Sequence, residues 1–381
     1  MKLLVNALSV NNQSGKQVLS GHLLSIQRSF GDKVAITVLC RKSQSWFWSD
    51  FQRAQKIVAP ESTSKWWTRY CWEKGSLSGL CRKMTADFYF TPSGIAAGHV
   101  PIPQIVLAQN PWCFIPEVHQ TVSDCLKGFI QRKAYADTMR QADTMVFNSR
   151  FMRKAYRENA RCVEKRGVIA FNGVSNELYR EAQKSRGLAR VDGKIVSVSV
   201  MASHKGHETL VEALGILRKK YQMAHARVFL IGSWPDDQYH RKIAKDVERR
   251  DLKGSVEFCG HVSFSELLNH YATAKVYCLL SHCESFGIPA AEAQVFGTPV
   301  VLSDVCAMPE VGGDGGLYGP PNDAEKIAQS LFALLSDNQK WDVYSQAARI
   351  NAERFRWEKV SRPFIQILEE LSQSLGEKIE K

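Results

Sequence analysis

Residues 283–301 read CESFGIPAAEAQVFGTPVV, the pattern of a loop that opens a helix and is followed by a buried strand. Gly287 allows a close backbone approach, and Pro289 fits the first helical turn. A helix N-terminus presents unpaired N–H groups and the positive end of the helix dipole, which bind anions such as phosphate. Glu284 and Glu292 flank this point, and carboxylates accept strong hydrogen bonds from sugar hydroxyls. The pattern predicts an anion site between two carboxylates, with one capping and one surface glutamate as the plainer alternative.

Short β-rich runs alternate with helical patterns along the chain, which is typical of parallel sheets joined by crossover helices. In the first half we predict strands at 3–10, 33–40, 85–95, 103–108 and 142–149, with a polar loop after the first strand that ends at Lys16. In the second half we predict strands at 194–200, 226–232, 255–262, 274–281 and 298–304, and helices at 263–273, 288–296 and 323–336. This alternation predicts an α/β protein of two doubly wound, Rossmann-like units with ligand-binding loops at the carboxyl ends of the strands.

The length of 381 residues fits two domains of ordinary size. The composition, 44% hydrophobic and 23% charged, is globular, and no run approaches the ~20 apolar residues of a membrane-spanning helix. The first residues turn polar too early for a signal peptide, and the ten cysteines include no Cys-x-x-Cys pair. We therefore expect a cytoplasmic protein with reduced thiols.

The net charge of +12 is concentrated in residues 1–180, which hold 25 Lys and Arg against 12 Asp and Glu, whereas the remainder holds 25 against 26. Aromatic residues gather in the same half among Arg53, Lys56, Lys65, Arg69 and Lys74; they are Trp46, Phe47, Trp48, Phe51, Trp66, Trp67, Tyr70 and Trp72. Two interpretations stay open: a surface that faces an anionic membrane, or a Trp-rich core with a solvated basic rim. Because no nucleic-acid motif accompanies the charge, we expect no nucleic-acid partner.

The segment 283–301 resembles the E-x7-E motif of the retaining glycosyltransferases of family four, the group 1 glycosyltransferases, which have the GT-B fold. Further segments match the family in order: 142–156, 168–179, 199–214, 228–237, 256–281 and 355–360. The resemblance implies two facing Rossmann-like domains with a cleft between them. It implies an acceptor-binding domain of residues 1–172, to which a C-terminal helix of residues 358–381 returns, and a donor-binding domain of residues 173–357.

The resemblance also implies roles for three charged residues. Glu292 matches the glutamate that holds the ribose hydroxyls of the nucleotide, and Glu284 matches the one that contacts the transferred sugar. Lys205 matches the lysine that neutralises the diphosphate, which gains charge as it leaves. His204 and His207 flank this lysine without a third metal ligand, which favours a structural role for both.

Backbone positions complete the donor site that the resemblance implies. Phe286, Gly287 and Ile288 match the stretch whose backbone faces sugar and phosphate. Gly232 lies in the glycine loop after a matching strand, and Val262 lies in the segment whose backbone reads the base.

The chain departs from the family pattern at three places. Val200 stands where the family usually has an arginine for the diphosphate, and Lys16 is a candidate replacement. Gly15 is the remaining member of the usual glycine pair in the first loop and is still placed to let the backbone touch the donor phosphates. Gln109 and Asn110 stand where the family often has a histidine, and Asn110 either hydrogen-bonds the donor sugar or caps its own loop.

The absence of an Asp-x-Asp motif and of a dense His/Asp/Glu cluster leads us to expect no metal and no cofactor beside a nucleoside diphosphate sugar as co-substrate. The resemblance implies a retaining hexosyl transfer in which Glu284, Lys205 and Asn110 act on the reacting groups. It implies a saccharide acceptor, lipid-linked, in bacterial lipopolysaccharide or surface polysaccharide assembly at the inner face of the membrane. The alternatives are a degenerate sugar-nucleotide-binding module, a GT-B sugar-nucleotide epimerase, a glycogen-type synthase and a basic nucleic-acid binder.

Overall fold

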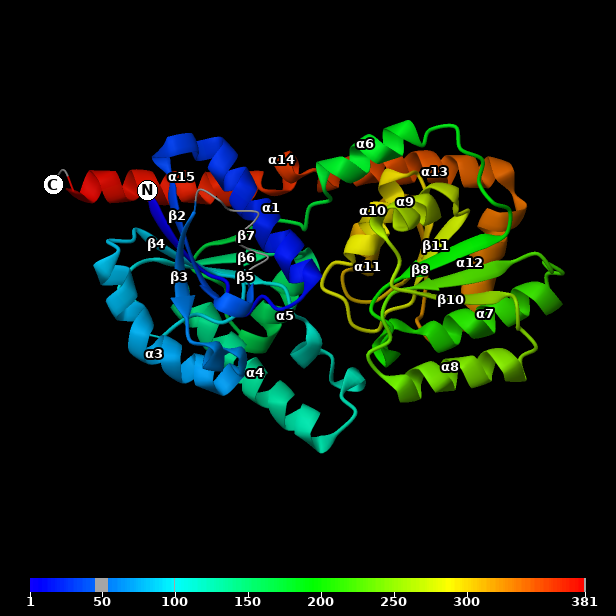
Figure 1. Cartoon of the computed structure of the whole chain (residues 1–381), viewed down its shortest axis with the longest axis horizontal. Helices are drawn as coiled ribbons and strands as arrows, with labels where there is room; N and C mark the ends of the chain where they lie inside the picture. Colours follow the sequence, from blue (N-terminus) through cyan, green and yellow to red (C-terminus); the bar gives the residue numbers. More distant parts are fainter. Residues whose placement is uncertain (45–53, 99, 380–381) are drawn as a thin grey trace. The chain divides into compact units, whose positions relative to one another are not determined.

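The computed structural model describes residues 1–44, 54–98 and 100–379, and its internal contacts divide the chain into two compact units. The first unit comprises Met1–Gly173 and Trp357–Lys381, and the second comprises Val174–Arg356. The predicted boundaries lie one residue from these. Each unit is a parallel sheet with helices on both faces (Figure 1).

The sheet of the first unit has seven parallel strands in the order β3-β2-β1-β4-β5-β6-β7. The strands are β1 Lys2–Asn6, β2 Ala35–Arg41, β3 Gln55–Ala59, β4 Phe88–Thr91, β5 Gln104–Ala108, β6 Thr144–Phe147 and β7 Gly167–Ile169. Leu3 of β1 lies opposite Ile36 of β2 on one side and Phe88 of β4 on the other. The strand order therefore reverses next to β1, and ligands of open α/β sheets bind at such a reversal.

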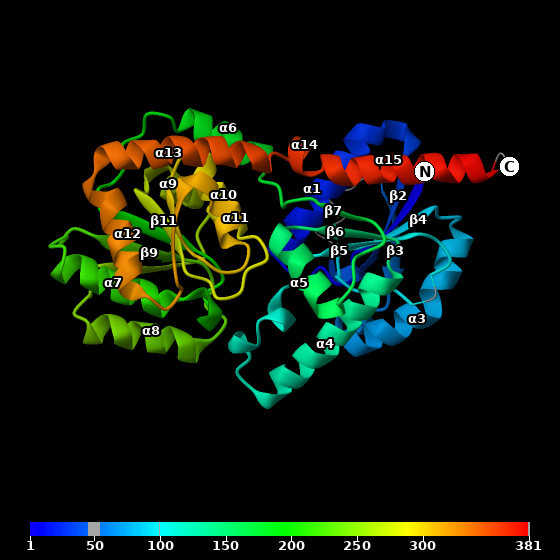
Figure 2. The ribbon, with the colours of Figure 1, turned by 180° about the vertical axis from the view of Figure 1, so that it is seen from behind.

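The helices of this unit are α1 Gln13–Phe30, α3 Trp66–Lys83, α4 Val122–Gln141, α5 Arg150–Ala160, α14 Trp357–Val360 and α15 Arg362–Ile379. Helices α3 and α4 cover one face of the sheet and α1 and α15 the other (Figures 1 and 2). Because both faces are covered, inward residues of the strands such as Leu4, Val106 and Phe147 are fully buried.

The C-terminal segment returns to the first unit, as the family resemblance implied. Trp357 is buried against α1, where a Cβ added to Gly21 would lie 2.0 Å from the indole ring. Phe364 of α15 is fully buried, and its ring centroid lies 5.0 Å from that of Phe90. One face of the first unit's sheet is thus covered by C-terminal residues, which begin more than 180 positions after the N-terminal stretch of this unit ends.

The sheet of the second unit has six parallel strands in the order β10-β9-β8-β11-β12-β13, and its order reverses between β8 and β11. The strands are β8 Lys194–Val198, β9 Arg227–Ile231, β10 Val256–Gly260, β11 Val276–Leu279, β12 Val300–Ser303 and β13 Gly316–Gly319. The helices are α6 Asn176–Lys184, α7 His207–Lys219, α8 Asp237–Arg249, α9 Phe264–Thr273, α10 Ile288–Val295, α11 Met308–Gly312, α12 Ala324–Ser336 and α13 Asn338–Ala352. A core cluster joins the strands to α7, α8 and α12.

The ten predicted strands are all present, but β3, β7 and β13 were missed. Strand β7 has three residues and β13 reads GLYG, so neither carries a clear alternation of apolar and polar residues. The polar loop predicted to end at Lys16 is wrong, because the Asn12 side chain accepts the Gly15 N–H and starts α1 at Gln13.

The features predicted from composition fall partly within the described residues. The predicted cluster members Trp46, Phe47, Trp48, Phe51 and Arg53 lie outside them. All ten cysteines are free thiols. In the described ranges, none of the helices combines the length and the apolar character needed to cross a bilayer.

Candidate functional site

Lys205 and Glu284 meet at the carboxyl edge of the second sheet, beside the reversal of its strand order. Lys205 follows β8 and Glu284 follows β11, the two strands between which the order reverses. The Lys205 Nζ lies 2.5 Å from Glu284 Oε2, and the side chains are 13% and 19% exposed. Two residues that are 79 positions apart in the sequence therefore form one partly buried ion pair where α/β sheets bind ligands.

The backbone holds the two loops together independently of this ion pair. Gly206 begins α7 with φ +71°, and a Cβ at this position would lie 2.3 Å from the carbonyl oxygen of Leu280. The carbonyl of His204 accepts hydrogen bonds from the His282 N–H at 2.8 Å and from Ser281 Oγ at 3.2 Å. Because glycine adopts this φ without strain and has no Cβ to clash with the Leu280 carbonyl, Gly206 fixes the place of Lys205 against the β11 loop.

The start of α10 lies in the same loop as Glu284. Gly287 precedes the helix with φ +89°, and no side chain caps its first turn among the described residues. The ring of Phe286 is buried and packs edge-on against Phe355, with ring centroids 5.3 Å apart. The side chain of Phe286 therefore anchors the loop in the core, and Gly287 and Ile288 beside it are buried as well.

Glu292 lies one turn into α10, and its position is fixed by a tyrosine from the preceding helix. The hydroxyl of Tyr271 donates to Glu292 Oε2 at 3.0 Å, and Tyr271 is fully buried. The structure thus places Lys205, Glu284, Glu292 and the backbone of 286–288 in the two loops that follow adjacent strands and in the first turns of α10.

Histidines beside Lys205 are held neutral. Burial lowers the pKa of His204 to about 4, with a smaller effect of the Lys205 charge, and burial lowers the pKa of His207 to about 4 as well. Lys205 therefore carries the positive charge of this loop at neutral pH, with no cationic histidine directly beside it. Among the described residues, no group of three His, Cys, Asp or Glu could hold a metal ion.

A hydrogen-bonded network around His207 was missed from the sequence. The hydroxyl of Tyr239 donates to Glu208 Oε2 at 2.7 Å and lies 3.1 Å from His207 Nδ1. Because the hydroxyl proton goes to Glu208, Nδ1 of His207 is the donor to Tyr239. The network joins the start of α7 to α8 and so supports the Lys205 loop. It was missed because its partners lie about 30 residues apart in the sequence and only the fold brings them together.

Gly232 and Val262 lie in the loops after β9 and β10. Gly232 has φ +143°, and a Cβ there would lie 1.7 Å from the carbonyl oxygen of Ser199 in the β8 loop. Val262 is half-buried directly before Ser263, which caps α9. Val200, at the place of the family's arginine, has a side chain that is 55% exposed. At the position of the family's arginine, this chain therefore has an exposed apolar side chain that forms no buried contact in its place.

Gly15 and Lys16 belong to the first unit and lie in the first turn of α1 rather than in a loop. The N–H of Gly15 donates to Asn12 Oδ1 at 2.7 Å, and the N–H of Lys16 donates to the Asn12 carbonyl at 3.0 Å. Both amides are thus engaged in the start of the helix. Their contact with donor phosphates stays a prediction.

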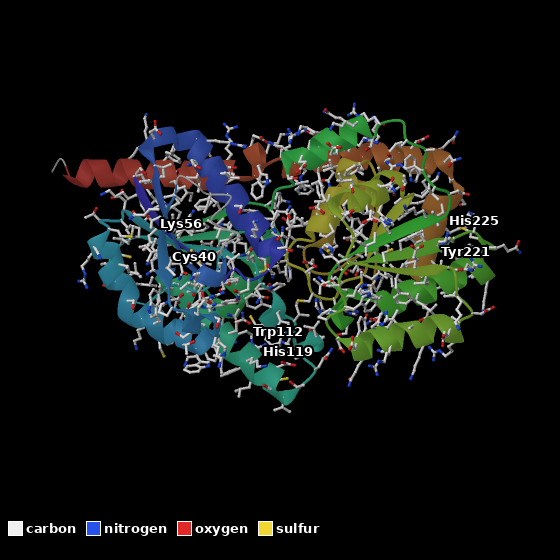
Figure 3. All side chains as sticks on the ribbon, viewed as in Figure 1. Cys40, Lys56, Trp112, His119, Tyr221 and His225 are labelled. Carbon is white, nitrogen blue, oxygen red and sulfur yellow. The ribbon has the colours of Figure 1, made fainter. Side chains whose placement is uncertain are left out.

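Asn110 also belongs to the first unit, in the loop after β5. Its Oδ1 accepts the N–H of Trp112 at 3.1 Å, the loop-capping role that the sequence left open. The rings of Trp112 and His119 then pack 4.3 Å apart and order the loop (Figure 3). The contact of Asn110 with the donor sugar stays a prediction.

A second polar cluster lies at the strand-order reversal of the first sheet and was missed. Asn6, at the end of β1, donates through Nδ2 to Glu73 Oε1 at 2.7 Å and to the Tyr89 hydroxyl at 2.8 Å. Burial raises the pKa of Glu73. The signal was present in the sequence, because Asn6 ends an apolar run and Glu73 is the single acidic residue of α3.

Sequence comparison finds a family match within the second unit. Residues 179–351 match the family model described as glycosyl transferases group 1. O-antigen chain mannosyltransferase B of Escherichia coli is 31% identical over 168 residues, which are 44% of this chain and 43% of that protein. The chain spans about half the length of the curated relatives it matches.

Structural comparison extends to both units. Sucrose-phosphate synthase from Thermosynechococcus elongatus superposes with a TM-score of 0.77 at 19% identity, over 98% of this chain and 100% of that chain. Anabaena HepE in complex with UDP-glucose gives a TM-score of 0.70 at 17% identity, over 98% and 100%. At these identities the likeness establishes the fold, which is GT-B. The sequence match is confined to residues 179–351, less than half of the chain, and this segment of the second unit is similar to the group 1 glycosyltransferases.

Proposed function

We propose that this protein is a retaining glycosyltransferase that moves a hexose from a nucleoside diphosphate sugar to a saccharide acceptor. The observation that carries the proposal is the Lys205–Glu284 ion pair at the strand-order reversal of the second sheet, in the loop that leads into α10. The family of residues 179–351 and the UDP-glucose in the HepE structure support a nucleotide-sugar donor.

The proposed mechanism relies on orientation and charge. Lys205 and the N-terminus of α10 stabilise the negative charge that grows on the departing diphosphate. Glu284 accepts a hydroxyl hydrogen bond from the transferred sugar, and Glu292 accepts hydrogen bonds from the ribose. The acceptor hydroxyl attacks on the face that the diphosphate leaves, and a departing phosphate oxygen takes its proton. The reaction needs no metal, because Lys205 and the helix dipole supply the positive charge.

We further propose that the acceptor is lipid-linked and that the first unit meets an anionic membrane. Apolar residues on one face of α4 are exposed: Val122 by 87%, Leu126 by 60%, Phe129 by 60% and Ile130 by 48%. Their spacing of four, three and one residues places them on one stripe of the helix, the α4 stripe. Trp66, Trp67 and Tyr70 of α3 are also exposed, and such aromatic residues favour the membrane interface. The named activity of the Escherichia coli relative on an O-antigen chain supports an acceptor in surface polysaccharide assembly.

A thermal-shift screen of UDP-, GDP- and ADP-sugars tests the donor, because a ligand at 100 times its dissociation constant stabilises the folded state by about 2.7 kcal/mol. With the donor known, we expect Glu284→Ala to lower kcat at least ~100-fold and Glu292→Ala mainly to raise the KM for the donor. Glu325→Ala, a surface change on α12, serves as the control. Near-normal kinetics of both site variants would remove the site assignment.

A sugar-nucleotide-binding module without transfer activity is the second candidate. Val200 favours it, because the exposed valine leaves the diphosphate with one cation fewer than the family pattern. Release of nucleoside diphosphate in the presence of acceptor distinguishes the two: a module binds the donor with no turnover, whereas a transferase releases the diphosphate in step with product.

A further inference from the structure

A basic hollow lies in the second unit among α6, the end of α10 and α13. It has a volume of about 340 Å³, part of it open to solvent. Its charged and polar lining residues are Tyr179, Gln183, Arg186, Arg349, Glu353 and Arg356. Three arginines against one glutamate give it a formal charge of +2. None of these residues belongs to the donor site proposed above.

The glutamate is already engaged by one of the arginines. Arg356 donates through Nε and Nη2 to the two carboxylate oxygens of Glu353, at 2.5 and 2.9 Å. Its guanidinium also lies 3.9 Å from the ring centroid of Tyr179. Arg356 and Glu353 thus neutralise each other, and the excess positive charge rests on Arg186 and Arg349.

Arg186 and Arg349 have no carboxylate to neutralise them. Throughout the described ranges, neither guanidinium forms a hydrogen bond or an ion pair with the protein. The two charges are close enough to interact, since the pKa of Arg349 is lowered by burial and then by Arg186. Arg190 adds a third positive charge nearby: burial and then Arg349 lower its pKa to about 10, and it donates to carbonyl oxygens and a hydroxyl rather than to an acid.

The position of Arg349 is built into the fold. Gly297, two residues after the end of α10, has φ +70°, and a Cβ there would lie 2.3 Å from Arg349 Nε and 2.5 Å from its Cζ. The missing side chain leaves a slot in which the half-buried guanidinium lies. Ordering a half-buried guanidinium without an acceptor costs free energy, and an anion in the hollow offsets that cost.

We propose that Arg186 and Arg349 bind a phosphoryl group of a phosphorylated small molecule in this hollow, as an anion site separate from the donor site. Two guanidiniums offer planar, paired donors that match the oxygens of a phosphate. The hollow is partly open to solvent and Arg186 in its lining is exposed, so such a ligand enters without unfolding the unit. The site goes beyond the proposed transfer reaction and does not depend on it.

Arginine footprinting with phenylglyoxal, read by peptide mass spectrometry, tests the proposal at the residues themselves. The experiments use the full chain carrying Lys205→Ala, so that the proposed diphosphate cation does not contribute. We expect saturating inorganic pyrophosphate to slow modification of Arg186 and Arg349 at least ~5-fold and to leave the exposed Arg180 of helix α6 unprotected. Calorimetric titration with pyrophosphate should then show at least ~10-fold weaker binding for Arg186→Gln, whereas Arg180→Gln, the matched charge change, should bind normally.

The second arm uses vesicles of phosphatidylcholine with and without phosphatidic acid. Protection by pyrophosphate supports a soluble phosphorylated ligand, and protection by phosphatidic acid vesicles alone supports the same phosphoryl site with a lipid headgroup as its source. No protection in either arm would overturn the proposal, as would equal weakening by Arg180→Gln and Arg186→Gln, which indicates a general charge effect. Arg186 is exposed, so its replacement tests the site without the risk of misfolding that a change at Arg349 carries.

Discussion

Gly206 determines at the scale of one residue where the cation of the donor site lies. Replacement by alanine forces a side chain into φ +71° and against the Leu280 carbonyl, whereas Gly254, at φ +76°, has open space around it. We expect Gly254→Ala to lower the free energy of unfolding by the backbone strain alone, about 1 kcal/mol. Gly206→Ala should lower it by about 1–3 kcal/mol more, because the two loops must also separate. Urea unfolding of both variants measures the difference. Equal losses would show that the contact with Leu280 does not constrain the loop.

The Lys205–Glu284 ion pair leads to a prediction that runs against the simple view of a binding residue. In Glu284→Gln, Lys205 loses its carboxylate partner and becomes free to pair with a phosphate. We expect this variant to bind nucleoside diphosphate a few-fold more tightly at low salt, while transfer becomes slower. Calorimetry at two salt concentrations measures the affinity. Glu292→Gln is the control, since loss of the proposed ribose contact should weaken binding, and a similar weakening by Glu284→Gln would contradict the proposed role of Lys205.

At the scale of an element, α4 carries apolar side chains that the described residues of the first unit leave exposed. We expect Val122→Ser, Leu126→Ser and Phe129→Ser together to reduce co-sedimentation with anionic vesicles at least ~10-fold, because each buried apolar side chain contributes about 1.5–3 kcal/mol to transfer out of water. The control is Val343→Ser with Ile350→Ser on α13, which removes similarly exposed apolar residues from the second unit. Equal loss with both sets, or no vesicle binding by the unaltered protein, would refute a membrane role for the α4 stripe.

At the scale of the whole molecule, His22 joins the two ends of the chain within the first unit. It lies in α1, its ring packs 5.1 Å from Trp357 and 5.6 Å from Phe364, and its Nδ1 lies 3.3 Å from Ser361 Oγ. Burial lowers its pKa from 6.5 to about 4. The attachment of the C-terminal segment therefore depends on a neutral histidine.

This attachment should weaken in acid. Between pH 6.5 and 4 the unfolded chain binds a proton at His22 that the folded chain does not, so stability is present above 6.5 and is lost as the pH falls toward 4. From pH 7 to pH 5 we expect the first unit to lose about 2 kcal/mol more in the natural protein than in His22→Gln. Hydrogen exchange of α1 and α15 in urea measures the loss. The control replaces His225, an exposed histidine of the second unit (Figure 3), and His225→Gln should keep the pH dependence of the natural protein. If the stability of the first unit falls with pH as steeply in His22→Gln as in the natural protein, His22 is not the cause of that fall.

Much of the fold could be predicted because local patterns and the family motif agree. The strands of the second unit are continuous apolar runs, since both faces of a parallel sheet are buried, and each is bounded by glycine or polar residues. Of the missed strands, β7 has three residues and β13 contains two glycines, so pairing with a neighbour rather than propensity makes them strands. Strand β3 reads QKIVA and lies at the edge of its sheet, where it pairs with β2 alone. The start of α1 was misplaced because the cap by Asn12 is one local hydrogen bond within a polar run.

The α/β class, the two units and the residues of the E-x7-E segment could be predicted before any packing was known, because periodicity and spacing are properties of neighbouring positions. The packing of the elements was needed to show that Lys205 and Glu284 neutralise each other, that Tyr271 holds Glu292, and that Arg186 and Arg349 line one hollow whose glutamate, Glu353, is paired with Arg356. Each of these relations joins side chains from different elements across 21 to 163 positions, and burial and hydrogen bonding between such elements exist only once the sheet and its helices have packed.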